Sequence, residues 1–186
     1  MRDAGASTGP TSLDRWADDA RSIEAAQRRA RHASLVNQAA ETATLAGLLV
    51  DMGERAAAIS VHLTNGVTHH GTIIDVGSDY FRIDTAAGPA IVSSDATASI
   101  RPRPGTPSIF SARPGSTTTL DDLLADLAAD ECEVSMTTRT DPGPLLGRLL
   151  FASLELLGLV VGEDQRVFVT RSQLADVRLT ERPRAW

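Results

Sequence analysis

The chain contains no lysine, a single cysteine and few aromatic residues. Without lysine it can form no lysine Schiff base and present no P-loop lysine, since all 18 basic residues are arginine. With Cys132 alone, no internal disulfide can form. No apolar run approaches the roughly 20 residues that a membrane-spanning helix needs, and the first residues lack the apolar segment of a secretory signal. We therefore expect a cytoplasmic protein that does not engage a membrane, and the arginine- and alanine-rich composition is typical of a high-GC bacterium.

Positive charge is also scarce where a nucleic-acid surface would need it. The formal net charge is −6. Between positions 44 and 100 two arginines stand against six acidic residues, and between 119 and 180 five stand against eleven. Because affinity for nucleic acids comes largely from neutralised phosphates, this distribution disfavours RNA binding unless the few arginines converge on one rim.

Motifs that would indicate catalysis are missing as well. The sequence has no G-x-G-x-x-G, no G-K-[ST] and no C-x-x-C pair. Cys132 shares strand parity with Val134 and Met136, which favours a core position over a reactive thiol. We expect no enzyme, no catalytic residue and no cofactor.

The main positive feature is an internal repeat. Each of its two insertions falls where turn residues cluster, and hairpin loops tolerate changes in length whereas strands do not. This placement favours the duplication of one unit. The aligned segments are 44–61 with 119–136 at an offset of 75, 71–83 with 147–159 at an offset of 76, and 90–101 with 167–178 at an offset of 77.

Each unit reads as a short helix followed by five short antiparallel strands. Thr44 and Thr119 can cap the first turn of a helix, and the leucines that follow at i, i+3 and i+4 form one apolar stripe. The period then changes to two. Asn65-Gly66 predicts a hairpin, and Gly71 inside the next strand predicts a bend of the kind that closes a small barrel.

The pattern V-x-L-x-N-G, then a strand glycine, an aspartate and a closing I-R, resembles the Sm-like fold. This is the small SH3-like barrel of the LSm and Hfq proteins. The resemblance covers about residues 44–102 and extends to 119–180. It implies oligomeric rings and often single-stranded RNA binding. The matching residues are Val61, Leu63, Asn65, Gly66, Gly71, Ile73, Asp75, Ile100 and Arg101.

This sequence departs from that family at its RNA-contacting positions. The asparagine that the family carries after its second strand has no clear counterpart, and the neighbourhood contains Tyr80, Phe81 and Arg82 instead. The glycine after I-R is replaced by Pro102 and Leu179. The residues kept as candidate ligand or RNA contacts are Tyr80, Arg82, Arg101 and Arg178.

The predicted fold is α+β, with a long N-terminal helix followed by two tandem five-stranded antiparallel Sm-like or SH3-like β-barrels, each preceded by a short helix. We expect Ile109-Phe110 to pin the linker between the barrels to a barrel surface. The expected segments are a disordered tail at 1–11, a helical arm at 12–43, a first barrel at 44–102, a linker rich in Pro, Gly and Ser at 103–118, and a second barrel at 119–181.

The helical arm contains no glycine or proline and carries a thin apolar seam. It can join copies or dock a partner, which makes a homo-oligomer the expected state. The alternative is a solvated face balanced by nearby acidic residues. The candidate docking residues are Trp16, Ile23, Arg28, Arg29 and Arg31.

Three of the four histidines lie in one predicted hairpin. A two-residue loop pairs His62 with His69, and a three-residue loop pairs His62 with His70, so either register places two imidazoles opposite each other. A metal site needs a third or fourth ligand, and Leu145 and Leu146 stand at the equivalent positions of the second unit. No metal ligand is predicted, with His62, His69 and His70 kept as candidates.

Three hypotheses for function remain. The first is a non-enzymatic protein-interaction or scaffold module built from the two barrels and the arm. The second is an RNA-binding Sm-like protein that forms part of a ring or pseudo-ring. The third is a metal-responsive or pH-responsive protein that acts through its histidines.

Overall fold

The structure is a computed structural model that describes residues 12–106 and 114–180. Its internal packing divides the chain into two units, Met1–Thr42 and Ala43–Trp186. The tail predicted at 1–11 and the predicted anchor Ile109-Phe110 lie outside the described residues. In the described part of the chain, no helix is long and apolar enough to cross a membrane.

The described residues of the first unit, from position 12 onward, form a helix. Helix α1 spans Ser12–Glu41, where no glycine or proline interrupts the backbone. Glu24 and Arg28 form an ion pair of 3.3 Å one turn apart on this helix, a spacing that stabilises helices modestly.

The described residues of the second unit form two α-helices and ten strands, which follow the predicted repeat. The first half contains α2 (Leu45–Glu54), β1 (Ile59–Leu63), β2 (Thr68–Val76), β3 (Tyr80–Thr85), β4 (Gly88–Ser93) and β5 (Thr97–Pro102). The second half contains α3 (Leu120–Ala129), β6 (Glu133–Thr138), β7 (Leu145–Ala152), β8 (Leu156–Val161), β9 (Gln165–Thr170) and β10 (Leu174–Leu179). In each half a 3₁₀ turn, Ser94–Ala96 or Arg171–Gln173, precedes the last strand.

The two halves match in detail. The capping threonines act as predicted, since Thr44 accepts from the N–H of Gly47 and Thr119 accepts from that of Asp122. The last strand pairs with the first in both halves, β5 with β1 and β10 with β6. A register irregularity interrupts β2–β3 after Ile73 and β7–β8 after Leu149, which are equivalent positions at an offset of 76. This agreement supports the duplication.

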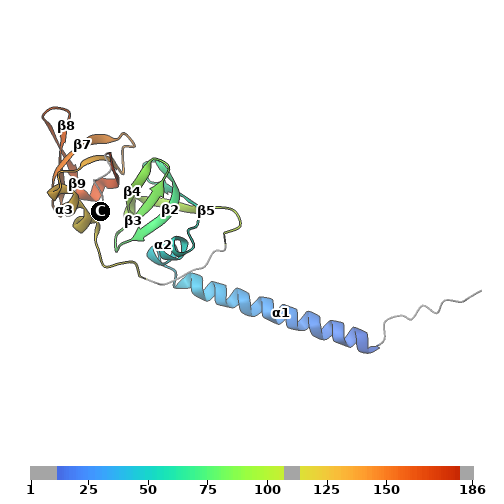
Figure 1. The fold of residues 1–186 in the computed structure, drawn as a ribbon. Helices are drawn as coiled ribbons and strands as arrows, with labels where there is room; N and C mark the ends of the chain where they lie inside the picture. Colours follow the sequence, from blue (N-terminus) through green and yellow to red (C-terminus); the bar gives the residue numbers. More distant parts are fainter. Residues whose placement is uncertain (1–11, 107–113, 181–186) are drawn as a thin grey trace, which may run out of the picture. The chain divides into compact units, whose positions relative to one another are not determined.

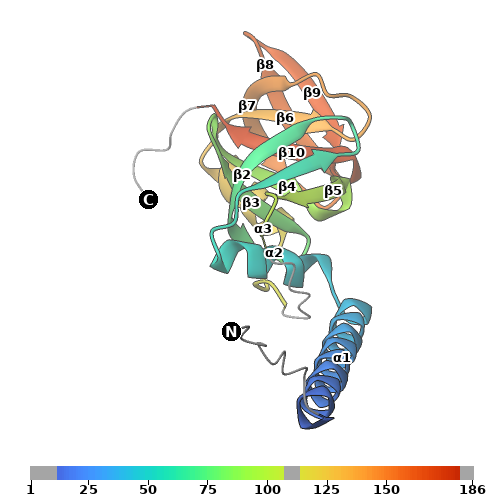
Figure 2. The ribbon, with the colours of Figure 1, turned by 90° about the vertical axis from the view of Figure 1, so that its right-hand side faces the viewer.

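The prediction of two separate five-stranded barrels is wrong. The strands form one ten-stranded antiparallel sheet in the order β5-β1-β2-β3-β4-β10-β6-β7-β8-β9. Strand β4 does not return to β5 of its own half but pairs with β10 of the other (Figures 1 and 2). The physical reason is that β4 and β10 each have a second edge of unpaired backbone N–H and C=O groups. Pairing β4 with β10 gives the groups on both edges hydrogen-bond partners.

The hydrophobic core lies in two clusters that exchange residues across this pairing. Most members of each cluster come from one half. However, Tyr80 and Ile91 of the first half pack into the second cluster, and Ala175 of β10 packs into the first. The two core clusters therefore share residues between the halves, whereas two closed barrels would each have a core of their own.

Two glycines lie where a neighbouring strand passes close to the backbone, Gly71 on β2 and Gly147 on β7. A Cβ at Gly71 would lie 1.8 Å from the carbonyl oxygen of Asp84 on β3. At the equivalent Gly147, a Cβ would lie 2.3 Å from the carbonyl oxygen of Val160 on β8. Both glycines therefore allow a neighbouring strand to approach more closely than any side chain permits.

Candidate functional site

The feature that organises the second unit is the pairing of β4 with β10, which we call the junction. Its register places Ala90 opposite Arg178, and Ile91 opposite Val177. Figure 2 shows β10 between β4 and β6, so that β10 is paired along both edges. The junction therefore buries two strand edges and the apolar side chains they carry.

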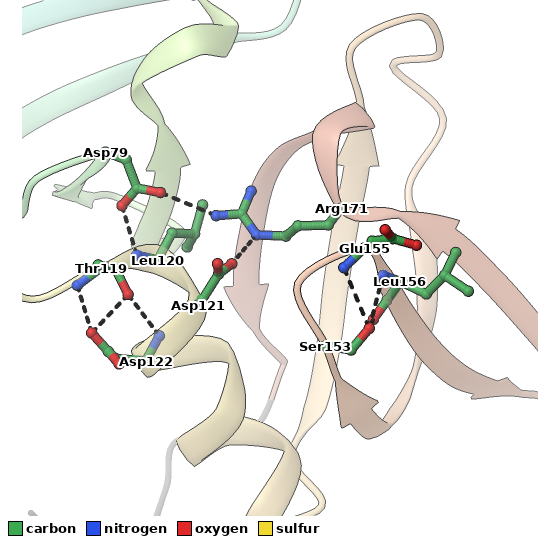
Figure 3. A network of polar contacts seen from close by, with 9 residues as sticks. All are labelled: Asp79, Thr119, Leu120, Asp121, Asp122, Ser153, Glu155, Leu156 and Arg171. Carbon is green, nitrogen blue, oxygen red and sulfur yellow. Dashed lines mark hydrogen bonds and ion pairs between the residues drawn. The ribbon is translucent and has the colours of Figure 1, made fainter.

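One rim of the junction is held by an acidic residue of the first half. The Asp79 carboxylate accepts a 2.7 Å hydrogen bond from the N–H of Leu120, the first residue of α3. It also accepts from Nη2 of Arg171 at 3.2 Å, and Arg171 forms a second ion pair with Asp121 (Figure 3). A carboxylate at a helix N-terminus is favoured by the helix dipole, so Asp79 fixes the start of α3 against the first half.

A buried polar cluster crosses the junction beside the hairpin of β1 and β2. His69 is only 2% exposed, and its Nε2 lies 2.6 Å from Oδ2 of Asp176, although the N–H does not point straight at that oxygen. Nη2 of Arg178 donates to Nδ1 of His69 at 3.0 Å. A guanidinium is always a donor, so Nδ1 of His69 is the acceptor in this contact and Nε2 is the ring nitrogen beside Asp176.

Asp176 is the anionic centre of this cluster. The hydroxyl of Thr137 donates to Oδ1 of Asp176, and Thr137 in turn accepts from Nδ2 of Asn65 at 3.1 Å. Burial by itself raises the pKa of Asp176, but the contact with His69, the hydrogen bond from Thr137 and the charge of Arg178 outweigh it and hold the pKa below its ordinary value. The carboxylate is therefore ionised at neutral pH and joins the halves.

The predicted pairing of two histidines across the hairpin is wrong. His62 pairs with Thr68, His69 pairs with Val61, and His70 pairs with Ser60. The Nδ1 atoms of His62 and His70 contact the hydroxyls of Thr68 and Ser60 at 3.0 and 2.8 Å. The difference is a shift of the hairpin register by one or two residues. Within 12–106 and 114–180, no group of three or more His, Cys, Asp or Glu residues could hold a metal ion.

The four candidate RNA contacts do not come together. Tyr80 is 1% exposed and donates to Oδ2 of Asp75 at 2.9 Å, and burial followed by that bond raises its pKa to about 12. Arg82 is half-buried on β3. Arg101 is exposed on the outer strand β5, whereas its equivalent Arg178 lies in the junction.

The candidate docking residues of the arm all lie within α1. The side chains of Arg28, Arg29 and Arg31 are exposed. The side chains of Trp16 and Ile23 lie outside the described residues, so the predicted apolar seam stays a prediction.

The sequence reasoning missed an exposed apolar surface on the outer strands of the second half. We call it the β9 face and define it by Phe151, Leu156 and Phe168, which are 41%, 41% and 60% exposed. The rings of Phe151 and Phe168 lie 6.3 Å apart between centroids, a tilted aromatic pair. Leu154, in the turn before β8, is 81% exposed. A signal was present, because the run Val167-Phe168-Val169 places an aromatic at the opposite parity from two core-facing valines.

An open groove lies beside β7 and β8 and is lined by Glu133, Arg148 and Glu163 among others. Arg148 forms an ion pair with Glu131. Burial, and then the nearby Asp130, raises the pKa of the Cys132 thiol, which lowers its reactivity.

Comparisons with protein-family models, with curated proteins and with solved structures found no match to this chain. The Sm-like resemblance of the sequence therefore stays a prediction.

Proposed function

We propose that this chain is a non-enzymatic interaction module that binds another protein surface through the β9 face and the open edge of β9. The observation that carries the proposal is the concentration of large exposed hydrophobic side chains on one end of the sheet. Contiguous exposed apolar patches on folded proteins mark interaction sites or aggregation sites.

The energetics favour a partner on this face. Burying a Leu or Phe side chain fully contributes about 1.5–3 kcal/mol. Because Phe151, Leu156 and Phe168 are exposed, a partner that covers them would gain a large part of this free energy. Strand β9 is also an outermost strand of the sheet, so its outer edge offers backbone hydrogen bonds to an added strand.

A protein partner fits the charge better than RNA does. The second half carries five arginines against eleven acidic residues, and two of its arginines, Arg171 and Arg178, are engaged at the junction. Bases can stack on exposed aromatics, so Phe151 and Phe168 are the feature that keeps RNA as the alternative.

Site-specific photocrosslinking inside cells tests the proposal. A photoreactive amino acid replaces Phe168 in the full chain, and the matched control replaces Ile74, which is 51% exposed on β2 away from the β9 face. We expect one discrete crosslinked product from position 168 that protease degrades and ribonuclease does not. No product beyond that of the Ile74 control contradicts the proposal, and a ribonuclease-sensitive product supports RNA instead.

A further inference from the structure

We propose that helix α1 pairs antiparallel with α1 of a second copy of this chain, so that the acidic half of each helix lies along the basic half of the other. This surface is separate from the β9 face, and the pairing does not depend on the function proposed above. Three features of α1 support it, namely its exposure, the division of its charges and its predicted apolar seam. Pairing through α1 joins two copies of the chain, and hence two β9 faces, in one assembly.

Helix α1 has no covered face among its described residues. It spans Ser12–Glu41, a length of 30 residues, and it belongs to a unit separate from the sheet. Every side chain described on it is exposed, including Leu35 at 64%. Because most helical stability in proteins comes from packing of one face rather than from helix propensity, a long helix in water is stabilised by a partner along its length.

The charges of α1 are divided along the helix. Residues 12–24 contain four acidic residues and two arginines, whereas residues 25–38 contain three arginines and no acidic residue. In a parallel pair each half would lie against the same half of the other copy, and like charges would oppose. In an antiparallel pair the acidic half lies against the basic half, and two-fold symmetry gives this contact twice. Charges that flank a helix pair set its orientation in this way.

The ion pair within the helix does not remove these charges from the surface. Glu24 and Arg28 lie 3.3 Å apart, yet their side chains are 65% and 70% exposed. The side chains of Arg29 and Arg31 are exposed as well. The basic half of α1 is therefore accessible to an acidic segment of a second helix.

The predicted apolar seam gives the pair a line of contact and a register. Its 3-4 spacing continues past Ile23 through small or uncharged side chains, which let two helices approach closely. Because Gln27 lies at the middle of α1, helices that overlap along their whole length place position 27 opposite itself and position 20 opposite position 34. The seam positions in order are Leu13, Trp16, Ala20, Ile23, Gln27, Ala30 and Ser34.

The same register brings opposite charges together. With position 27 at the centre, Glu24 of one copy lies opposite Ala30 of the other and next to its Arg31. The seam itself is thin, so the pair depends largely on these exposed charges. Exposed charges are screened by salt, and we therefore expect the pair to weaken as the salt concentration rises.

Directional disulfide trapping tests the arrangement. In a Cys132→Ser background, one sample of the full chain carries Ala20→Cys and a second carries Ser34→Cys. We expect a disulfide dimer when the two are mixed and oxidised and little from either alone, because antiparallel helices place position 20 opposite position 34. The matched control is Gln27→Cys, which opposes itself and gives a dimer alone. Dimers from Ala20→Cys alone and from Ser34→Cys alone indicate a parallel pair and overturn the inference, as does the absence of a dimer from Gln27→Cys.

Light scattering of the full chain tests the charge complementarity without added thiols. At about 100 µM and about 0.1 M salt we expect twice the 19.7 kDa chain mass. Reversing the three arginines of the basic half should give the monomer, since both halves are then acidic. Reversing three acidic residues in the same chain as well should restore the dimer, because the two halves have then exchanged their charges. The first set is Arg28→Glu, Arg29→Glu and Arg31→Glu, and the second adds Asp14→Arg, Asp18→Arg and Asp19→Arg.

The matched control for the mass is Phe168→Glu, which changes the β9 face and leaves α1 intact. We expect this variant to keep the dimer mass. A monomeric wild-type chain, or a doubly reversed chain that stays monomeric, overturns the inference and leaves the proposed function standing. A monomer produced by Phe168→Glu also overturns it, because the contact between copies would then lie on the β9 face.

Discussion

Replacing Asp176 with asparagine removes the charge at the centre of the junction while keeping its shape. The carboxylate is 2% exposed, contacts Nε2 of His69 and accepts from Thr137. Asparagine can still accept from Thr137, but its amide then opposes the ring N–H of His69, and Arg178 loses its counter-ion.

The magnitude follows from these contacts. A hydrogen bond to a charged group contributes about 1.5–3 kcal/mol. Asp176 contacts His69 and accepts from Thr137, and its Oδ2 lies 3.8 Å from Nε of Arg178. Because the side chain of Arg178 is 33% exposed, water replaces part of its lost interaction. We therefore expect Asp176→Asn to lower the free energy of unfolding by about 2–3 kcal/mol.

Urea unfolding followed by circular dichroism measures this change, with an unchanged slope on denaturant as the sign that compactness is preserved. The matched control is Ser99→Asn, at the equivalent exposed position of β5, where we expect a change below about 0.5 kcal/mol. A loss below about 0.5 kcal/mol for Asp176→Asn refutes the assignment of this cluster as the tie between the halves.

The pH dependence gives a second readout of the same variant. The pKa of Asp176 is lowered in the folded chain, so its contribution is present above the unfolded pKa of about 3.9 and is lost as the pH falls through the folded pKa. The stability difference between wild type and Asp176→Asn should therefore shrink between pH 7 and pH 3. A difference that grows in acid would show that the carboxylate is not held ionised.

Further predictions concern the packing and the titrating groups of the sheet. Gly71→Ala and Gly147→Ala should each cost about 1–3 kcal/mol in urea unfolding, because the new methyl group meets the backbone of the neighbouring strand; stability within error of wild type would show that the strands can part. Tyr80 is the single tyrosine, so absorbance at 295 nm should report a phenol with a pKa of about 12; a midpoint near 10 would mean that its bond to Asp75 does not hold. Because the phenol pKa is raised in the folded chain, its contribution to stability is present below about pH 10 and is lost as the pH rises through about 12. The Cys132 thiol should react with a thiol reagent at pH 7.5 more slowly than a free cysteine does, since its pKa is raised; a faster reaction would contradict its inert environment.

The strand content and the repeat could be predicted from the sequence because both are local. Capping at Thr44 and Thr119 and the turn at Asn65-Gly66 depend on nearby residues alone. The hairpin register near His69 was misjudged because the turn signal does not fix how many residues the loop contains.

The topology of the sheet could not be predicted in the same way. Alternation of apolar residues tells which side chains face a core, but it does not tell which strand satisfies an open edge. Nothing in β4 or β10 taken alone favours pairing with the other half over closure within its own. His69 and Asp176 are more than one hundred residues apart in the sequence, and no sequence motif predicts their contact.

Hydrogen exchange of the full chain tests most directly whether one sheet joins the two halves. We expect the amides of β4 and β10 to exchange more slowly than those of the outer strands β5 and β9, because both edges of β4 and β10 are paired. Exchange of β4 and β10 as fast as that of the outer strands would contradict the junction.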